Sequence, residues 1–334
     1  MVQKSISSLA PGLTVLVGGA ILAKLIGAYL PGNNHLLLAI VIGFFLANTG
    51  SLPSVAKPGI RTHKLWLTTG IVLMGASLTL GHLFETGPTV LLIVLTVAAF
   101  TLLTVEGISR IAFNISDELS SLLAAGSSIC GVSAIIAVAG SIKAKEHLIA
   151  YATGTILLFD GITLLVYPII GEVLNIPAKV FGIWAGVSMF STGPVVAVGF
   201  AHSAEAGQWA TITKLTRNTL IGFVAVIYAT NYARKHTNTE SRLRLRSLWE
   251  GFPKFVLGFL FLMIIASAGL LSEQHVASLT NTYDWLFLLA FIGLGTEIRI
   301  GRLRQSGYRP ALLVLVSFLI ISSLSLILIS FILI

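Results

Sequence analysis

Long apolar runs dominate the pattern of this sequence, and short polar or charged connections separate them. A helix needs about 20 predominantly apolar residues to cross the hydrocarbon core of a bilayer. The longest polar segment, Asn231–Gly251, is too short to fold alone, so no soluble domain is predicted. The apolar runs predict nine spanning helices, over Pro11–Leu30, His35–Asn48, Lys64–Leu83, Pro88–Arg110, Leu148–Ile170, Gln208–Thr230, Phe252–Leu271, Thr282–Ile300 and Pro310–Ile334.

Two further regions, Asp117–Ile142 and Ile176–His202, are apolar but interrupted by small and polar residues. In LAAGSSICGVSA (Leu123–Ala134), Gly, Ser and Cys replace the Leu and Val of an ordinary membrane helix, and Ser191–Pro194 interrupt the second region. A non-helical backbone survives at membrane depth only where protein or a water-filled cavity covers it. We therefore predict an all-α polytopic membrane protein with about 9–11 transmembrane segments, two of them broken or re-entrant.

Composition agrees with a membrane protein, since the 334-residue chain is 55% hydrophobic and only 10% charged. A soluble domain carries roughly 25% charged residues. The net charge of +8 comes from short loops without interleaved aromatic residues, which argues against nucleic-acid binding. The single Cys130 excludes a disulfide framework and a multi-cysteine metal site. The N-terminus has no clear cleavage site, so we interpret it as the first membrane helix.

Lys and Arg are concentrated in alternate loops, which predicts the orientation of the chain. Basic loops lie on the cytoplasmic side of a membrane. The opposite loops, which include Gly32–Asn34, Glu85 and Glu273, contain no Lys or Arg. We therefore predict a multi-pass protein of the cell membrane with a cytoplasmic N-terminus and an external C-terminus. The predicted cytoplasmic positions are Lys57, Arg61, Arg110, Arg234–Arg246 and Arg299–Arg309.

Two pairs of segments indicate internal repeats. Gly75–Leu83 (GASLTLGHL) matches Gly295–Leu303 (GTEIRIGRL), and Ser128–Ala139 echoes Ser188–Gly199 more weakly. Chance similarity between apolar segments is the alternative. Secondary transporters with inverted repeats form their sites at broken helices between the repeats. We therefore predict one transmembrane transporter domain over residues 1–334, with halves 1–171 and 172–334.

The residue types at the two breaks favour an anion site. A helix that restarts after a break presents free N–H groups and the positive end of its dipole. Pro194 fits the first turn of such a helix, because proline has no N–H group. Close packing of small residues between helices is the alternative, and Cys130 fits a packing role better than a reactive thiol. The candidate substrate-binding residues at the breaks are Gly126, Ser127, Ser128, Cys130, Gly131, Ser133, Ser191, Thr192 and Gly193.

Asp160, Lys214 and Arg217 are the charged residues inside predicted spans that most strongly indicate a site, because charge within the membrane is costly and usually functional. Lys214 and Arg217, in TITKLTRNTL, share a helix face because they are three residues apart, and Asp160 lies deep in Leu148–Ile170. One interpretation is an ion pair from Asp160 to Lys214 or Arg217 that only joins two helices. We favour the other, in which the two cations and Asn218 attract an anion while Asp160 supplies a counter-charge or carries a proton. Arg217 is the preferred ligand, because its fork binds oxyanions in bidentate fashion.

Motifs of other function classes are absent from the sequence. There is no GxxxxGK[ST] nucleotide loop, no GxSxG or HExxH, and no Ser–His or paired-carboxylate arrangement. The lone histidines have no metal-ligand spacing. We therefore expect no enzymatic activity, no cofactor and no metal.

Several specific motifs are spread over nearly the whole length of the chain. The most specific stretch is GSSICGVSAI (Gly126–Ile135), followed by KAKE (Lys143–Glu146). The others are GIWAGVS (Gly182–Ser188), KLTRN (Lys214–Asn218), PGL…LLLAIVIGFFLAN near the start and GLGTEIR (Gly293–Arg299). In these motifs the chain resembles the YeiH-type sulfate exporter family.

The resemblance implies an inverted-repeat fold with two crossing broken helices, as in the cation/proton antiporter and anion transporter group. It also implies sulfate export. The chain departs from the family pattern at Met189–Pro194, where relatives commonly have Ile-His-Glu-x-Ala-Gln, and at Asp160, where relatives more often have a small residue. These departures predict a difference in substrate or coupling ion.

The function that we predict is secondary transport of a small anion such as sulfate, an organic sulfonate or a carboxylate. The alternatives are an anion channel, whose filter the breaks would form, and a membrane enzyme or regulatory membrane subunit. The expected partners are the anion, a coupling proton or sodium ion, the lipid bilayer and, in a homodimer, a second copy of the chain.

Overall fold

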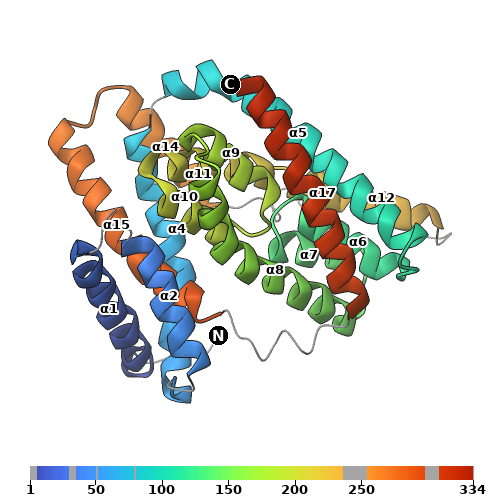
Figure 1. Cartoon of the computed structure of the whole chain (residues 1–334), viewed down its shortest axis with the longest axis horizontal. Helices are drawn as coiled ribbons and strands as arrows, with labels where there is room; N and C mark the ends of the chain where they lie inside the picture. Colours follow the sequence, from blue (N-terminus) through green and yellow to red (C-terminus); the bar gives the residue numbers. More distant parts are fainter. Residues whose placement is uncertain are drawn as a thin grey trace. The chain divides into compact units, whose positions relative to one another are not determined.

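The computed structural model describes residues 6–29, 35–49, 52–78, 80–235, 254–297 and 308–333 (Figure 1). Within these ranges the chain forms helices joined by short connections and has no strand, so the predicted all-α class is confirmed. Four described stretches are long and apolar enough to cross a membrane: Ser8–Tyr29, Gly87–Ile111, Glu146–Val173 and Tyr308–Leu333. These features agree with a polytopic membrane protein.

The first of two compact units comprises Met1–Gly87, Val196–Gln208 and Lys254–Ile300. Within it, α15 packs against α4, α2 and α1. A Cβ atom on Gly43 would lie only 2.1 Å from the carbonyl oxygen of Ile292, so glycine lets α2 and α15 approach closely. The helices of this unit are α1 (Ile6–Tyr29), α2 (His35–Asn48), η1 (Ser54–Ala56), α3 (Lys57–Ile60), α4 (His63–Met74), η2 (Gly75–Ser77), α14 (Phe255–Ser267) and α15 (Glu273–Gly295).

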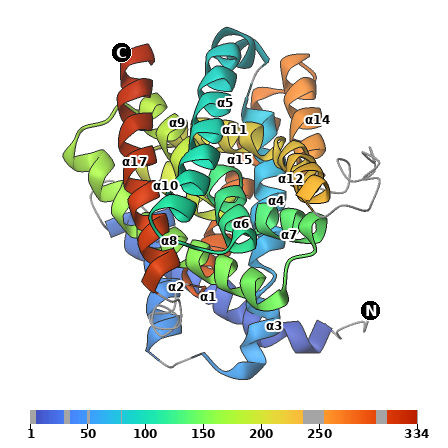
Figure 2. The same ribbon diagram turned by 90° about the vertical axis from the view of Figure 1, so that its right-hand side faces the viewer.

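The second unit comprises Pro88–Val195, Trp209–Pro253 and Gly301–Ile334 (Figure 2). Within it, α7 packs against α12, α6 packs against α7 and α8, and α17 packs against α9 and α8. Its helices are α6 (Asp117–Ser128), α7 (Val132–Ile142), α8 (Glu146–Val173), α9 (Ala178–Ser188), α12 (Ile221–Lys235) and α17 (Tyr308–Leu333). The remaining helices α5 (Leu80–Ile111), α10 (Thr192–His202) and α11 (Ala204–Asn218) have residues in both units.

Most predicted spans coincide with helices, and α2 has the predicted bounds. The prediction of Lys64–Leu83 extends too far, because Leu78 is extended and separates η2 from α5. The prediction of one helix over Gln208–Thr230 is wrong, since α11 ends at Asn218 and α12 begins at Ile221. There the N–H groups of Thr219 and Leu220 bond to carbonyls three residues back. Thr219 Oγ1 also donates to Thr216 O at 2.7 Å, so this side chain competes with the backbone for a helical carbonyl.

Both regions predicted to be broken are broken in the structure. Asp117–Ile142 forms α6 and α7 with three residues between them, and α9 and α10 flank residues 189–191 in the same manner. The loops predicted at Gly32–Asn34, over most of Asn231–Gly251 and over most of Arg299–Arg309 lie outside the described residues. Most of the repeat Gly295–Leu303 does so too, and the inverted repeats stay a prediction.

The two compact units draw segments from both predicted halves. Residues 1–171 contribute to both units, and so do residues 172–334. The two predicted repeat halves therefore do not correspond to the two compact units. The division into halves 1–171 and 172–334 stays a prediction about repeats.

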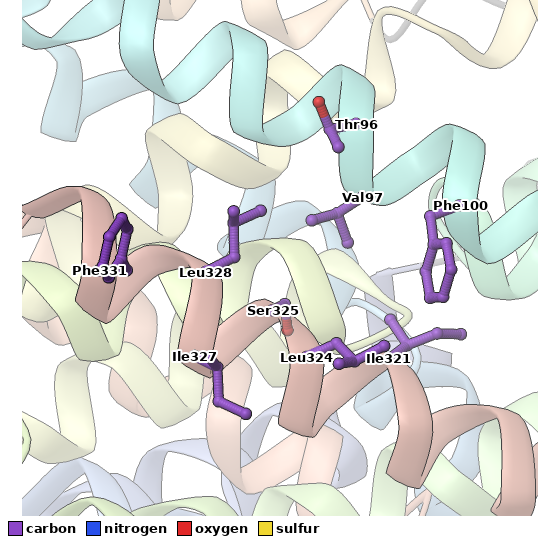
Figure 3. A pocket seen from close by; sticks show the side chains of 9 residues that line it. All are labelled: Thr96, Val97, Phe100, Ile321, Leu324, Ser325, Ile327, Leu328 and Phe331. Carbon is purple, nitrogen blue, oxygen red and sulfur yellow. The ribbon is translucent and has the colours of Figure 1, made fainter.

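Apolar side chains such as Leu103, Ile169 and Ile327 are exposed along the long helices of the second unit, as expected of surfaces that face lipid. An apolar groove of about 400 Å³ lies between α5 and α17, and Figure 3 shows Phe100 and Ile321 among the side chains that line it. Thr96 and Ser325 are the only polar residues in its lining, and no charged residue contributes. This groove therefore offers nothing that would select an anion.

Candidate functional site

The two breaks touch each other through a glycine and a serine. Gly131, which directly precedes α7, has φ +61°, and a Cβ atom there would lie 2.3 Å from Ser191 Oγ. Ser191 directly precedes α10. The starts of α7 and α10 therefore lie beside each other, and only glycine fits at position 131.

The first break also bends the chain back on itself. A Cβ atom on Gly126, near the end of α6, would lie 2.9 Å from a side-chain carbon of Ile135 in the first turn of α7. The first turn of α7 thus lies against the last turn of α6. Ile156 of α8 lies within 3.3 Å of a Cβ atom placed on Gly126 and within 3.2 Å of one placed on Gly131, so it borders this bend on one side.

Lys214, on the last turns of α11, extends to the end of both broken helices. Its Nζ donates to the carbonyl oxygens of Ile129 at 2.8 Å and Met189 at 2.9 Å. Ile129 is the first residue after α6, and Met189 is the first residue after α9. The Lys214 side chain is fully buried, so these carbonyls replace water around the ammonium group.

Arg217, one turn further on, makes the same bridge with more bonds. Its Nε donates to Ser128 O at 2.5 Å and its Nη2 donates to Ser127 O, both at the end of α6. Its Nη1 donates to Met189 O at 2.8 Å and contacts Gly186 O at 3.5 Å, both at the end of α9. All three guanidinium nitrogens thus donate to backbone carbonyls.

A close helix contact makes these bonds possible. A Cβ atom on Gly186 would lie 2.6 Å from Cβ of Thr213, so α11 approaches α9 at the position of a glycine. The last four carbonyls of a helix lack partners within the helix, and its C-terminal end carries about half a negative charge. Lys214 and Arg217 therefore neutralise the carbonyl ends of α6 and α9.

Asp160 acts on the opposite kind of helix end. Its Oδ1 accepts the N–H of Ser191 at 3.0 Å, immediately before α10. Asp160 lies in the middle of α8 and is 3% exposed. Its carboxylate thus contributes negative charge at the positive amide end of α10. It also lies within electrostatic range of Lys214 and Arg217.

Several buried polar atoms at the crossing have no hydrogen-bond partner within the described chain. They are Ser127 Oγ, Thr213 Oγ1 and Asn218 Oδ1. The side chains of these three residues are at most 3% exposed. Buried polar groups are nearly always paired, so unpaired ones require an explanation such as an absent ligand or ion. Their clustering at the helix ends favours this explanation over chance.

The amide ends form the more accessible side of the crossing. Ser133 is exposed and Ser191 and Thr192 are half-buried, whereas Ser127, Ser128 and the two cations are buried. Within the described residues, no acceptor is present for the N–H groups of Thr192 and Gly193 or for those of Val132, Ser133 and Ala134. The amide donors without an acceptor thus lie beside the more exposed residues of the crossing.

The candidate residues at the two breaks lie at the ends of α6, α7 and α10 or in the connections beside them. The side chains of Asp160, Lys214, Arg217 and Asn218 reach these ends from α8 and α11. Cys130 lies in the first break and is 7% exposed, and Asn218 Nδ2 donates to Thr192 Oγ1 at 3.1 Å. Whether these residues bind a substrate stays a prediction. In the described residues no group of three His, Cys, Asp or Glu side chains could hold a metal ion.

One buried hydrogen-bond network near the site was not predicted from the sequence. Tyr167 OH donates to Ser188 Oγ and contacts Ser322 Oγ, both at 2.8 Å, and Trp184 Nε1 donates to Ser322 O at 2.9 Å. Trp184 also stacks on Tyr167, with ring centroids 4.2 Å apart. The network joins α8, α9 and α17 at the end of α9, so it positions the carbonyls that the cations bind. The GIWAGVS motif contains Trp184 and Ser188 and is its only trace.

Comparison with known proteins shows which sequences this chain is similar to. The family described as conserved hypothetical protein 698 matches residues 11–314. A UPF0324 membrane protein of Nitratidesulfovibrio vulgaris is 33% identical over 317 residues, which cover 91% of this chain and 88% of that protein. A UPF0324 membrane protein of Clostridium tetani is 33% identical over 308 residues, covering 85% and 88%. One from Agrobacterium fabrum is 29% identical over 327 residues, covering 96% and 92%. No solved structure matches the chain.

Proposed function

The chain belongs to the conserved hypothetical protein 698 family, and from this premise we propose that it is a secondary transporter of a small anion. One observation carries the proposal. Four helix ends meet at one place, and Lys214 and Arg217 occupy the carbonyl ends while amide donors of α7 and α10 remain free. Helix N-termini bind anions through such donors and through the helix dipole.

The cations act on the anion mainly through the helix ends. With the carbonyl ends neutralised, their negative potential no longer opposes an anion at the amide ends a few residues away. The predicted role of Arg217 as a direct ligand would require its donors to exchange backbone carbonyls for the anion. We therefore propose that Ser133, Ser191, Thr192 and Gly193 provide the first contacts.

The resemblance to sulfate exporters suggests the substrate class. A tetrahedral oxyanion such as sulfate or an organic sulfonate has several acceptors, which match the several free N–H groups of two adjacent helix starts. The proposed setting is the cell membrane, with a cytoplasmic N-terminus and transport outward. Enzymatic activity is not part of the proposal, because no nucleophile–base pair is present in the sequence motifs.

Counterflow in proteoliposomes tests the proposal. Vesicles containing the purified protein and loaded with unlabelled sulfate are diluted into a trace of labelled sulfate. A transporter is expected to accumulate label transiently above its equilibrium level, and other anions are then ranked by competition. A channel gives rapid equilibration without accumulation, and a regulatory subunit gives no flux; either result contradicts the proposal.

Cys130 provides an independent test of the location, because it is the sole cysteine of the chain. Bound sulfate is expected to slow the reaction of Cys130 with a small thiol reagent, since the residue lies in the first break. Chloride at equal ionic strength is the control for screening. Equal rates with sulfate and chloride, under conditions where sulfate is transported, would place the site elsewhere.

A further inference from the structure

Asp160 occupies a position that suits the anion itself. Ser191 accepts the first helical bond of α10, from the N–H of Val195 at 3.2 Å, and so acts as the N-cap residue. The carboxylate that binds the Ser191 N–H comes from the middle of α8, not from a neighbouring position in the chain. The Asp160 carboxylate therefore comes from another helix and occupies a position at the start of α10 where a bound anion would also be stabilised.

The acceptors at these amide ends are too few for the donors. Asp160 accepts the N–H group of Ser191, and the N–H groups of Thr192 and Gly193 have no acceptor within the described residues. Asn218 lies at the same end, with its Nδ2 bonded to Thr192 Oγ1 and its buried Oδ1 unpaired. An unpaired, 3% exposed amide beside free N–H groups indicates a ligand position.

We propose, resting on the transport function above, that Asp160 stands in for the anion: its carboxylate balances the amide ends while the site is empty, and it takes up one proton when a dianion binds. The proton comes from solvent and converts the carboxylate to the neutral acid, which can still accept the Ser191 N–H through its carbonyl oxygen. Transport of the dianion is thereby coupled to movement of a proton in the same direction.

A charge count supports this stoichiometry. The two amide ends contribute about +1 and the two carbonyl ends about −1. Lys214 and Arg217 add +2 and Asp160 adds −1, so the empty crossing has a surplus of about +1. A dianion would leave about −1 at a buried place with charged Asp160, but about zero with protonated Asp160. Burial disfavours net charge, so the dianion and the proton bind together.

The surroundings of Asp160 contain few other ionisable groups. α7, which packs against α8, has none, and those of α6 and α17 lie at their first turns, away from the breaks. α9 and α10 likewise carry theirs only at their far ends. The groups near the crossing are Lys214, Arg217, Cys130 and Tyr167. Lys214 and Arg217 are bound to the carbonyl ends, and none of the four groups is a carboxylate. Asp160 is therefore the carboxylate at the crossing that can exchange the proton.

Proton uptake on sulfate binding tests the inference in the full-length purified protein. Sulfate stays a dianion across the neutral pH range, so any proton taken up belongs to the protein. We expect calorimetry in buffers of different ionisation enthalpy to give one proton per sulfate. The Kd should then fall by up to about tenfold for each unit decrease in pH.

Asp160→Asn imitates the protonated acid and should bind sulfate with no proton uptake and with little dependence on pH. Glu146→Gln, an exposed carboxylate on the same helix, is the matched control and should keep the wild-type proton uptake. Sulfate binding by the wild type without proton uptake would overturn this inference and leave the transport proposal standing. So would proton uptake that persists in a folded Asp160→Asn protein. Failure of the wild type to bind sulfate at any pH would overturn both.

Discussion

At the scale of single residues, Arg217 shows how a predicted ligand can hold the structure together. Its guanidinium bridges the end of α6 and the end of α9 through backbone carbonyls. The sequence offered two roles for it, an anion ligand or an ion pair with Asp160. Asp160 instead binds the Ser191 N–H, so the helix ends are the partners that the structure shows for both residues.

Arg217→Ala should therefore destabilise the folded protein, by about 3 kcal/mol or more, because several buried carbonyls lose a charged donor. Arg217→Lys keeps the charge but not the fork, so we expect an intermediate loss. The melting temperature in detergent measures both effects. Addition of Asp160→Asn should not restore it; full rescue would mean that the attraction between Asp160 and Arg217 is the main role of this arginine.

Gly131→Ala tests the contact between the breaks. Its backbone at φ +61° and ψ −123° is unfavourable for any residue with a Cβ atom, and the added atom would collide with Ser191 Oγ. We expect about 1–3 kcal/mol from the backbone and a further loss from the collision. Gly140→Ala, on the same helix with open space around it, is the control and should be neutral. Equal thermal stability and sulfate flux in both variants would contradict this geometry.

At the scale of elements, the two broken regions could be predicted, but not the bounds of the breaks. The connections are residues 129–131 and 189–191, whereas Gly126–Ser128 belong to α6 and Thr192–Pro194 to α10. Clusters of Gly and Ser, and a Pro, interrupt apolar runs at places where the helical bond pattern cannot continue. The third break, at Thr219–Leu220, was not predicted, because Gln208–Thr230 was interpreted as one span although its first part is polar. The polar sequence TRNT was the signal available for this break.

The first broken region should enter and leave the membrane on the same side. A Cβ atom on Gly126 would lie 2.9 Å from Ile135, across the three-residue connection, and α6 packs against α7, so α7 turns back beside α6. A cysteine at the exposed Lys143 is then expected to react with impermeant reagents only from the cytoplasmic side, in a protein whose Cys130 is replaced by Ala. Labelling from outside alone would show instead that this region threads the membrane.

At the scale of the whole molecule, the basic loops predict that the C-terminus lies outside. A C-terminal reporter that works only in the cytoplasm should be silent in intact cells, and the same reporter at the N-terminus is the positive control. Strong signal from the C-terminal fusion would reverse the predicted orientation.

The partners of the charged residues could not be predicted from sequence, because they are backbone atoms. Any residue has a carbonyl, so nothing in the letters at positions 127–129, 186 or 189 marks them as acceptors for Lys214 and Arg217. Asp160 likewise bonds to an N–H group, which carries no residue type. The sequence could indicate that these charged residues are important and where the helices end. It could not indicate that the charged side chains bond to the helix ends.

The bonds of α11 also bear on how the protein is made. A helix with both Lys214 and Arg217 partitions poorly from the translocon into lipid, at about 2.5–3.5 kcal/mol for each charge near its centre. The carbonyls that accept these charges belong to α6 and α9, which precede α11 in the chain and leave the ribosome earlier. We therefore expect α11 to enter the membrane by docking onto helices already there, so that N-terminal fragments ending before α11 should insert stably while an isolated α11 should not.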